Sequence, residues 1–120
     1  MTKEFIGSAQ VPLSPAVRAG DFVYVSGQVP MVDGKKVEGG VAAETRAVLD
    51  NIGAVLEMAG CDMSDVVKTT VWLRDRDDFA AFNETYGTYF PTNPPARSTA
   101  ESRLMIDIAV EIEAIAYKPL

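Results

Sequence analysis

A rigid stretch of chain places a single arginine. Arg97 follows Pro94, Pro95 and Ala96. Each proline fixes its own φ and pushes the preceding residue toward extended geometry, so the guanidinium leaves the backbone from a defined position. The planar fork of arginine donates two parallel hydrogen bonds to a carboxylate and keeps its charge when partly buried. The pattern therefore indicates a carboxylate-binding residue, and the alternative is an ordinary surface ion pair beside a proline turn.

Other kinds of chemistry are limited by what the chain lacks. It contains no histidine and one cysteine, Cys61. A Ser-His-Asp triad, an imidazole acid or base and a histidine metal site are therefore excluded, which leaves carboxylates, arginine, hydroxyls, backbone groups and water. The pair Gly39-Gly40 lacks the Lys-Ser/Thr ending of a phosphate-binding loop, so we expect no nucleotide cofactor and no metal. The lone Cys61 cannot form an intramolecular disulfide and fits a reducing compartment.

Length and composition predict one domain spanning residues 1–120. Hydrophobic residues make up 48% of the chain and charged residues 23%, as in ordinary globular proteins. The net charge of −6 argues against binding to nucleic-acid phosphates or to anionic membranes. No apolar run is long enough to span a bilayer, and no signal peptide is recognisable. We therefore expect a cytoplasmic protein without a nucleic-acid or membrane partner.

The elements that position Arg97 begin with an extended N-terminal half. Residues 2–11 predict a first strand, and the prolines that follow predict an irregular crossing over 12–16. β-branched and aromatic residues predict a strand over 21–28, where Gly27 allows a bend or a close backbone approach. A hairpin is expected over 29–37, because it contains Asp33-Gly34.

Two helices are expected. Apolar residues at helical spacing predict the first over 42–59, ended by a cap at Gly60. Its polar residues are expected to face solvent: Glu44, Arg46, Asp50, Asn51 and Glu57. The second follows candidate caps at 75–78, and its aromatic stripe is expected in the core: Phe79, Phe82, Tyr86, Tyr89 and Phe90. Asn83 lies within that stripe and is a candidate for binding a ligand. The alternative is an ordinary surface asparagine.

Three strands complete the chain. Strand signals cover 66–73 and 96–102, the latter with Arg97 and Thr99 on one face. The last strand runs over 107–117 with one apolar face, and Glu111 lies on the other. The order predicts an α+β fold with two helices on one side of a mainly antiparallel or mixed sheet. The uncovered sheet face would meet water or another subunit.

Several segments together resemble the RidA family, also called the YjgF family. They are Ser26-Gly27-Gln28, Asp50-Asn51, 67–71, Asp78-Phe79 with Asn83 and Tyr86, Pro95-Ala96-Arg97-Ser98 and 110–116. The resemblance covers nearly the whole chain in order and with little gapping. It implies a chorismate-mutase-like subunit of the Bacillus type in a homotrimer, with ligand clefts between adjacent subunits.

The resemblance also implies an activity and a set of residues. Members of the family hydrolyse reactive enamines and imines, such as 2-aminoacrylate, to 2-keto acids and ammonia without a cofactor. Arg97 matches the residue that grips the substrate carboxylate, and Glu111 matches the acidic residue of the water or proton-transfer step. The cleft-lining positions correspond to Ser26, Gly27, Asn83 and Thr99. The implied partner is a small imine or keto acid that bears a carboxylate.

Two positions depart from the family pattern. Active members carry a tyrosine after the proline of the early loop, and here Ala16 follows Pro15; Thr99 stands where many members have cysteine. These changes keep a second function open: a non-catalytic trimer that binds small carboxylate metabolites in the same cleft. A ribonuclease activity is disfavoured by the acidic charge and the missing histidine.

Overall fold

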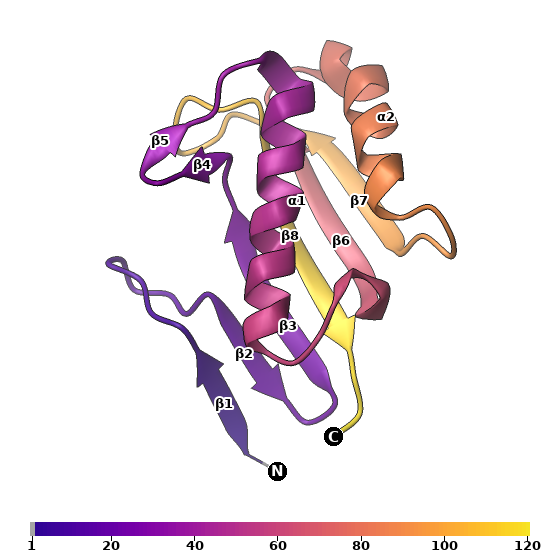
Figure 1. The fold of residues 1–120 in the computed structure, drawn as a ribbon. Coiled ribbons are helices and arrows are strands. Elements are labelled where there is room, and N and C mark those ends of the chain that lie inside the picture. The colour runs from indigo at the N-terminus through magenta and orange to yellow at the C-terminus, as the bar shows by residue number, and fades with distance from the viewer. Residues whose placement is uncertain (1) are drawn as a thin grey trace.

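The computed structural model describes residues 2–120, in which a six-stranded sheet carries two helices on one face (Figure 1). The strand order is β1-β2-β3-β8-β6-β7. The bounds are β1 Lys3–Ile6, β2 Ala16–Ala19, β3 Phe22–Gln28, β6 Val66–Leu73, β7 Ala96–Glu101 and β8 Val110–Tyr117. Strands β6 and β7 are parallel and the other neighbours antiparallel. The expected α+β class, with both helices over one face of a mixed sheet, is confirmed.

The remaining elements connect and cover these strands. The helices are α1 (Gly40–Met58) and α2 (Phe79–Tyr89), and short 3₁₀ helices occupy Met63–Asp65 and Arg76–Asp78. The expected hairpin is present as β4 (Met31–Val32) and β5 (Lys35–Lys36). Its turn places Asp33 and Gly34 at φ values of 53° and 79°, the left-handed geometry that a two-residue hairpin turn requires. Within residues 2–120, neither helix has the length and apolar character needed to cross a membrane.

A glycine cap ends α1 as the sequence predicts. Gly60 has φ of 78°, and its N–H donates to the carbonyl of Glu57 at 3.0 Å. The N–H of Cys61 donates to the carbonyl of Leu56 at 2.8 Å. These two bonds form a Schellman motif, which satisfies carbonyls that the helix end would leave unpaired. The chain is thereby turned so that Cys61 is buried as a small packing residue.

The hydrophobic core lies between α1, α2 and the helix-facing side of the sheet. Its largest fully buried apolar side chains are Phe82, Leu49, Ile52, Leu56, Leu73, Ile108 and Ile112. Buried and more exposed side chains alternate along β8, as the period of a strand requires. The buried ones belong to Val110, Ile112, Ala114 and Ala116. No helix of the described residues covers the opposite face of the sheet (Figure 1).

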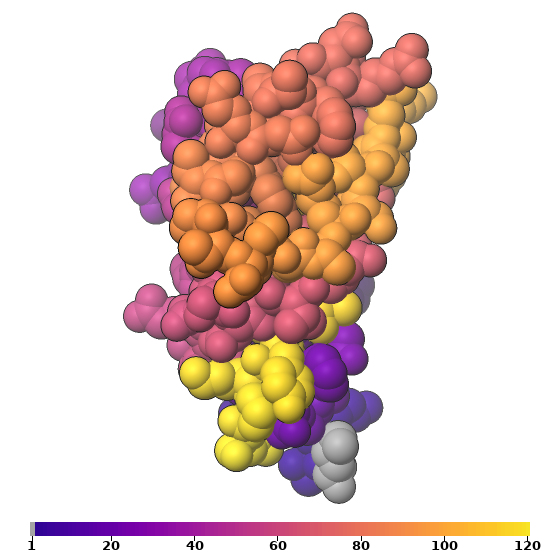
Figure 2. Space-filling view, turned by 90° about the vertical axis from the view of Figure 1, so that its right-hand side faces the viewer, coloured from indigo at the N-terminus to yellow at the C-terminus, as the bar shows by residue number. Residues whose placement is uncertain are grey.

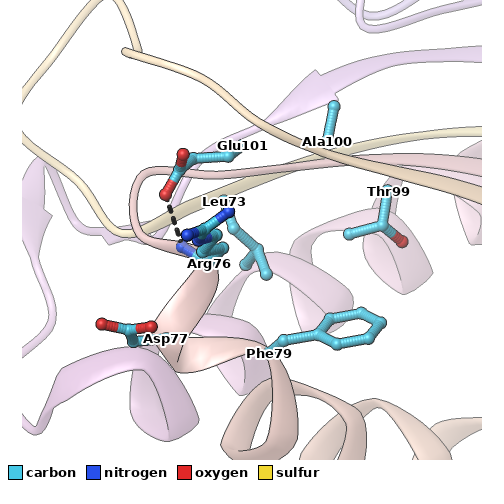
Figure 3. A pocket seen from close by; sticks show the side chains of 7 residues that line it. All are labelled: Leu73, Arg76, Asp77, Phe79, Thr99, Ala100 and Glu101. Carbon is cyan, nitrogen blue, oxygen red and sulfur yellow. Dashed lines mark hydrogen bonds between the residues drawn. The ribbon is translucent and has the colours of Figure 1, made fainter.

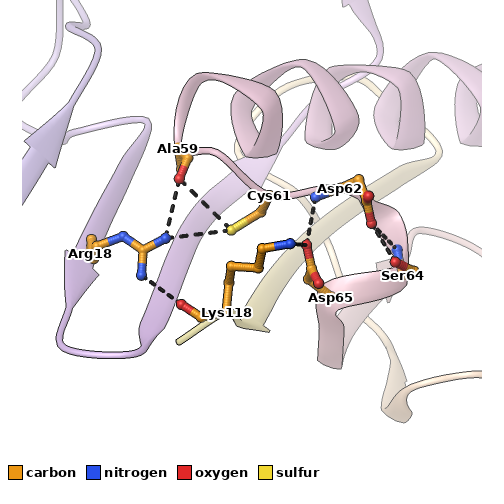
Figure 4. A network of polar contacts seen from close by, with 7 residues as sticks. All are labelled: Arg18, Ala59, Cys61, Asp62, Ser64, Asp65 and Lys118. Atoms are coloured by element: carbon orange, nitrogen blue, oxygen red, sulfur yellow. Dashed lines mark hydrogen bonds and ion pairs between the residues drawn. The ribbon is translucent and has the colours of Figure 1, made fainter. Parts of the chain in front are cut away.

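A buried arginine ties three parts of the chain together (Figure 4). Arg18 on β2 is 8% exposed and donates to the carbonyls of Gly20 at 3.2 Å, Lys118 at 3.0 Å and Ala59 at 3.2 Å. Ala59 is the C-terminal cap of α1, where carbonyls lack helical partners and the dipole favours a cation. Arg18 therefore joins β2 to the end of α1 and to the segment after β8. Burial raises the pKa of the neighbouring Cys61 thiol, although Arg18 opposes the rise.

Two expectations for the N-terminal half were wrong in extent. The first strand covers only Lys3–Ile6 instead of 2–11, and Ala16, expected as the end of the irregular crossing, begins β2, a strand that was not predicted. Strand β2 pairs on both sides, with Ala19 opposite Lys3 and also opposite Phe22. Its short sequence has little strand character of its own, so pairing with β1 and β3 determines its conformation.

The polar side of α1 is not uniformly solvated, contrary to expectation. Glu44 is 4% exposed, and its Oε1 accepts a hydrogen bond from the N–H of Ala109 at 2.7 Å. Asn51 donates through Nδ2 to the carbonyls of Val29 at 2.9 Å and Met31 at 3.1 Å. Both side chains therefore hold loops against the helix, whereas Arg46, Asp50 and Glu57 are exposed.

Candidate active site

Arg97 on β7 lies over three aromatic rings of α2. Its guanidinium carbon is 4.8 Å from the ring centroid of Tyr86, 5.4 Å from that of Phe82 and 5.6 Å from that of Phe79. A cation is attracted to the negative face of such rings. Figure 2 views this edge of the molecule, where α2 lies beside β7. We call Arg97 and these three residues the arginine cradle.

The sequence builds the cradle through two regular periods. Phe79, Phe82 and Tyr86 are spaced three and four residues apart, so they share one face of α2. On the sheet, Arg97 is opposite Thr69 of β6, and the hydroxyl oxygens of Thr69 and Tyr86 are 2.7 Å apart. Both of these residues are buried. The Thr69 hydroxyl therefore fixes the Tyr86 ring beneath the guanidinium.

The guanidinium of Arg97 has no acidic partner among residues 2–120. The ion pairs in this part of the chain join Arg74 to Asp107 and Lys118 to Asp65. The surface ion pair that was the alternative for Arg97 is thus not formed. No acidic side chain of the described residues therefore occupies its N–H fork, which is available to an anion.

Thr99 and Asn83 lie beside the cradle. Thr99 is half-buried on the same face of β7 as Arg97 and lines a hollow of about 430 Å³ (Figure 3). Its other lining residues are Leu73, Arg76, Asp77, Phe79, Ala100 and Glu101. Asn83 is half-buried, four residues after Phe79 and three before Tyr86 on α2. Helical spacing therefore puts Asn83 on the helix face that carries the rings.

Ser26, Gly27 and Glu111 form a second group, which we call the carboxylate cluster. Val25 pairs with Ala114 and Gln28 with Ile112, so β3 has a bulge at Ser26 and Gly27. A Cβ placed on Gly27 would clash with Oε2 of Glu111, so a larger residue here would displace this carboxylate. Gly27 thus provides the close backbone approach expected from the sequence.

The early loop fixes the bulge. The hydroxyl of Ser26 donates to the carbonyl of Ser14 at 2.6 Å, and its N–H donates to the carbonyl of Pro15 at 2.9 Å. Ala16, the position compared with the family tyrosine, is 0% exposed and packs in the core. Leu13 follows the other proline of the loop, is 50% exposed and adjoins Ser14. The residue after Pro15 is therefore a core residue, whereas the residue after Pro12 is exposed.

The electrostatics of the carboxylate cluster suit proton transfer. Partial burial raises the pKa of the Glu111 carboxyl, and the nearby Glu113 carboxylate raises it further. Glu111 also lines a shallow hollow of about 160 Å³ together with Trp72, Ser102, Arg103, Leu104 and Met105. A carboxyl with a raised pKa can accept and return a proton nearer to neutral pH than an ordinary glutamate.

The cradle and the carboxylate cluster lie on opposite sides of the sheet. Arg97 is opposite Thr69, which is buried beneath the helices, whereas Glu111 is opposite Trp72. Residues 69 and 72 of β6 are an odd number apart, so their side chains point to opposite faces. The chain thus brings together Arg97 with Thr99 and Asn83, and separately Glu111 with Ser26 and Gly27, but it does not join the two groups.

Sequence reasoning missed the residues that support Arg97. Phe79, Phe82 and Tyr86 were expected only as core, and Thr69 was not singled out. Phe82 and Tyr86 are indeed buried, but their rings also contact the guanidinium of Arg97. The available signal was an aromatic stripe on the helix just before the strand that holds the isolated arginine.

Comparisons with known proteins place this arrangement in a family. The family model described as Endoribonuclease L-PSP matches residues 4–118. A RutC family protein of Pyrococcus horikoshii is 49% identical over 110 residues, covering 89% of this chain and 87% of that protein. The 2-iminobutanoate/2-iminopropanoate deaminase of Homo sapiens is 45% identical over 110 residues, covering 89% of this chain and 80% of that protein.

A solved structure agrees with these matches. YyfA from Yersinia pestis, described as a protein of unknown function of the conserved Rid family, superimposes with a TM-score of 0.92 at 38% identity. The match covers 97% of this chain and 99% of that one. The family model spans almost the whole chain, and the relatives match over most of their own length. The chain therefore belongs to the RidA family.

Proposed function

We propose that this protein hydrolyses reactive 2-imino acids and their enamine tautomers to 2-oxo acids and ammonia. The observation that carries the proposal is Arg97, whose guanidinium lies over aromatic rings without an acidic partner in residues 2–120. Such an arginine suits a small ligand with a carboxylate. The name of the human relative, a deaminase of 2-iminobutanoate and 2-iminopropanoate, supports the reaction class.

The reaction needs orientation more than activation. The C=N carbon of a protonated 2-imino acid is already electrophilic, and Arg97 would fix it by holding the adjacent carboxylate. Orientation of this kind contributes about 7–11 kcal/mol in favourable intramolecular systems. Thr99 and Asn83 would line the same cleft and limit the rotation of the ligand.

Glu111 is the proton carrier in this proposal. Its carboxylate would take a proton from water as the water oxygen bonds to the imine carbon. The same carboxyl would return that proton to the nitrogen of the tetrahedral intermediate. The C–N bond then breaks as the hydroxyl group becomes the carbonyl, and the hydroxyl proton passes to the departing ammonia, which leaves as ammonium. The raised pKa of Glu111 supports this role, because a carboxyl that exchanges protons near the working pH is the more efficient catalyst.

A second copy of the chain would bring Arg97 and Glu111 together. The sheet face that carries no helix exposes large apolar side chains, among them Phe5, Phe22, Tyr24 and Tyr117. Exposed apolar surface of this kind is typical of an interface between subunits. We therefore propose a homotrimer in the cytoplasm, with three clefts that each combine the cradle of one subunit with the carboxylate cluster of the next.

A receptor without turnover is the second candidate. It is favoured by one observation: no tyrosine follows either Pro12 or Pro15 of the early loop. A binding trimer would use the same Arg97 cleft for 2-oxo acids or related carboxylates. The endoribonuclease description of the family model is not adopted, because a net charge of −6 offers little attraction for RNA.

The decay of imines in solution tests the proposal. A dehydratase would generate 2-iminobutyrate or 2-iminopropionate, and semicarbazide would trap what remains. We expect the wild type to accelerate decay, Arg97→Ala to abolish the acceleration, and Arg46→Ala, which removes an exposed arginine of α1, to keep it. If no imine decays faster with the wild type and 2-oxo acids still bind through Arg97, the receptor function replaces the deaminase.

A further inference from the structure

A hollow continues from the arginine cradle along β7. Arg97 and Thr99 share a face of the strand, and their Cα atoms are about 7 Å apart. Thr99 borders the hollow of about 430 Å³, and Phe79 belongs to both features. The Phe79 ring centroid is 5.6 Å from the Arg97 guanidinium carbon, and the same residue lines the hollow. A ligand held by its carboxylate at Arg97 would therefore have this space beside it.

The lining of the hollow separates into an apolar part and a charged end. Phe79 and Thr99 form the apolar part, and three charged residues form the other end (Figure 3). Leu73, which is almost fully buried, lies between these two groups. Those charged residues are Arg76, Asp77 and Glu101. The Glu101 carboxylate accepts a hydrogen bond from the N–H of Arg76 at 2.8 Å, which holds the charged end in place. The part nearest Arg97 is thus suited to apolar groups.

The size of the hollow points to a substrate class. A methyl or ethyl side chain on the substrate would leave the exposed ring of Phe79 in contact with water. A branched aliphatic or aromatic side chain would remove that surface from water, which is favourable. We infer that the preferred substrates are 2-imino acids with branched aliphatic or aromatic side chains, and that Phe79 sets this preference. The inference rests on the proposed deaminase function.

A ratio of two rates tests the inference. An L-amino acid oxidase, with catalase present to remove peroxide, would convert leucine and alanine to their 2-imino acids, and semicarbazide would trap the remainder. The measured quantity is kcat/KM for the leucine-derived imine divided by that for the alanine-derived imine. We expect this ratio to exceed about ten in the wild type, because each methylene in a fitted apolar pocket discriminates by about tenfold or more.

Two variants narrow the hollow, one from α2 and one from β7. Phe79→Trp and Thr99→Leu should each lower the ratio at least about tenfold, because the added volume slows hydrolysis of the leucine-derived imine more than that of the alanine-derived imine. Val32→Trp adds the same indole to an exposed residue of the β4–β5 hairpin outside the lining, and it should leave the ratio unchanged. Sedimentation would show whether each variant assembles like the wild type. If Phe79→Trp does not assemble, the ratio measured for Thr99→Leu decides the test.

The outcomes separate this inference from the proposed function. If the wild type hydrolyses the alanine-derived imine and the ratio is near one or insensitive to both variants, the side-chain preference is overturned and the deaminase stands. If neither imine decays faster, the deaminase is overturned. Calorimetric affinities for 4-methyl-2-oxopentanoate and pyruvate then decide the preference: tighter binding of the former, lost in Phe79→Trp, supports it, and equal affinities contradict it.

Discussion

Arg97 and Glu111 extend from opposite faces of one sheet, although the strands that carry them both border β6. Arg97 is opposite Thr69 in the parallel pair, and Glu111 is opposite Trp72 in the antiparallel pair. A single chain therefore presents the proposed carboxylate grip and the proposed proton carrier to different surroundings. Both can act on one small substrate only if the two groups come from different subunits.

The aromatic support of Arg97 gives a prediction about ligand affinity. Tyr86→Leu removes the ring closest to the guanidinium, and the Kd for 2-oxobutyrate should rise about two- to thirtyfold, as the loss of a cation–π contact of about 0.5–2 kcal/mol implies. Tyr86→Phe keeps the ring, so its affinity should stay within about twofold of the wild type. Titration calorimetry measures both, and an unchanged Kd in Tyr86→Leu would remove the role of the cradle.

Tyr86→Phe should instead affect stability. The Thr69 hydroxyl is buried and its partner is the hydroxyl of Tyr86, so the phenylalanine leaves it unsatisfied. An unpaired buried hydroxyl costs about 1–3 kcal/mol, which denaturant unfolding would detect. A stability equal to that of the wild type would show that Thr69 finds another partner.

The acid limb of the pH profile reports on Glu111. If its carboxylate takes the proton from water, kcat/KM falls as the pH drops through the raised pKa of Glu111. The Glu113 carboxylate contributes to that rise, because a second negative charge makes ionisation harder. Glu113→Gln should therefore lower the pKa of Glu111 and move the acid limb to lower pH.

The control for this shift is Glu57→Gln, which removes one exposed carboxylate of α1. Its acid limb should coincide with that of the wild type, so a general effect of net charge can be recognised. A limb that does not move in Glu113→Gln would mean that a group other than Glu111 controls the profile.

Glu44 and Glu57 on the same helix should differ in their contribution to stability. Glu44→Ala leaves the buried N–H of Ala109 without its acceptor and should cost about 1–3 kcal/mol in the free energy of unfolding. Glu57→Ala changes an exposed residue and should stay within about 0.5 kcal/mol of the wild type. Chemical unfolding of the two variants side by side checks this, and equal costs would contradict the role given to Glu44.

Periodic and capped segments were predictable from the sequence. The strand at 66–73 has the predicted bounds, and α1 ends at the Gly60 cap because local chemistry determines both. Strand β2 could not be recognised in this way, because its four residues become a strand by pairing with β1 and β3. The contacts of Glu44 and Asn51 likewise depend on loops that fold back onto α1.

The candidate site was predictable residue by residue but not as an arrangement. The proline approach identified Arg97, and the strand period placed Glu111 away from the core. The cradle depends on the parallel pairing of β6 and β7, which no local pattern encodes. The early loop contains two prolines, and only the structure shows that Ala16 is buried while Leu13 is exposed.

Mixed trimers test the central claim most directly. Arg97→Ala and Glu111→Gln subunits with different affinity tags would be co-expressed, and trimers that carry both tags would be isolated. Each variant alone should be inactive in the imine assay. In a cyclic trimer of either mixed composition, one cleft of the three would combine an intact Arg97 with an intact Glu111, so we predict about one third of the wild-type activity. Mixed trimers as inactive as the parent variants would show that both residues act from the same subunit and would contradict the account.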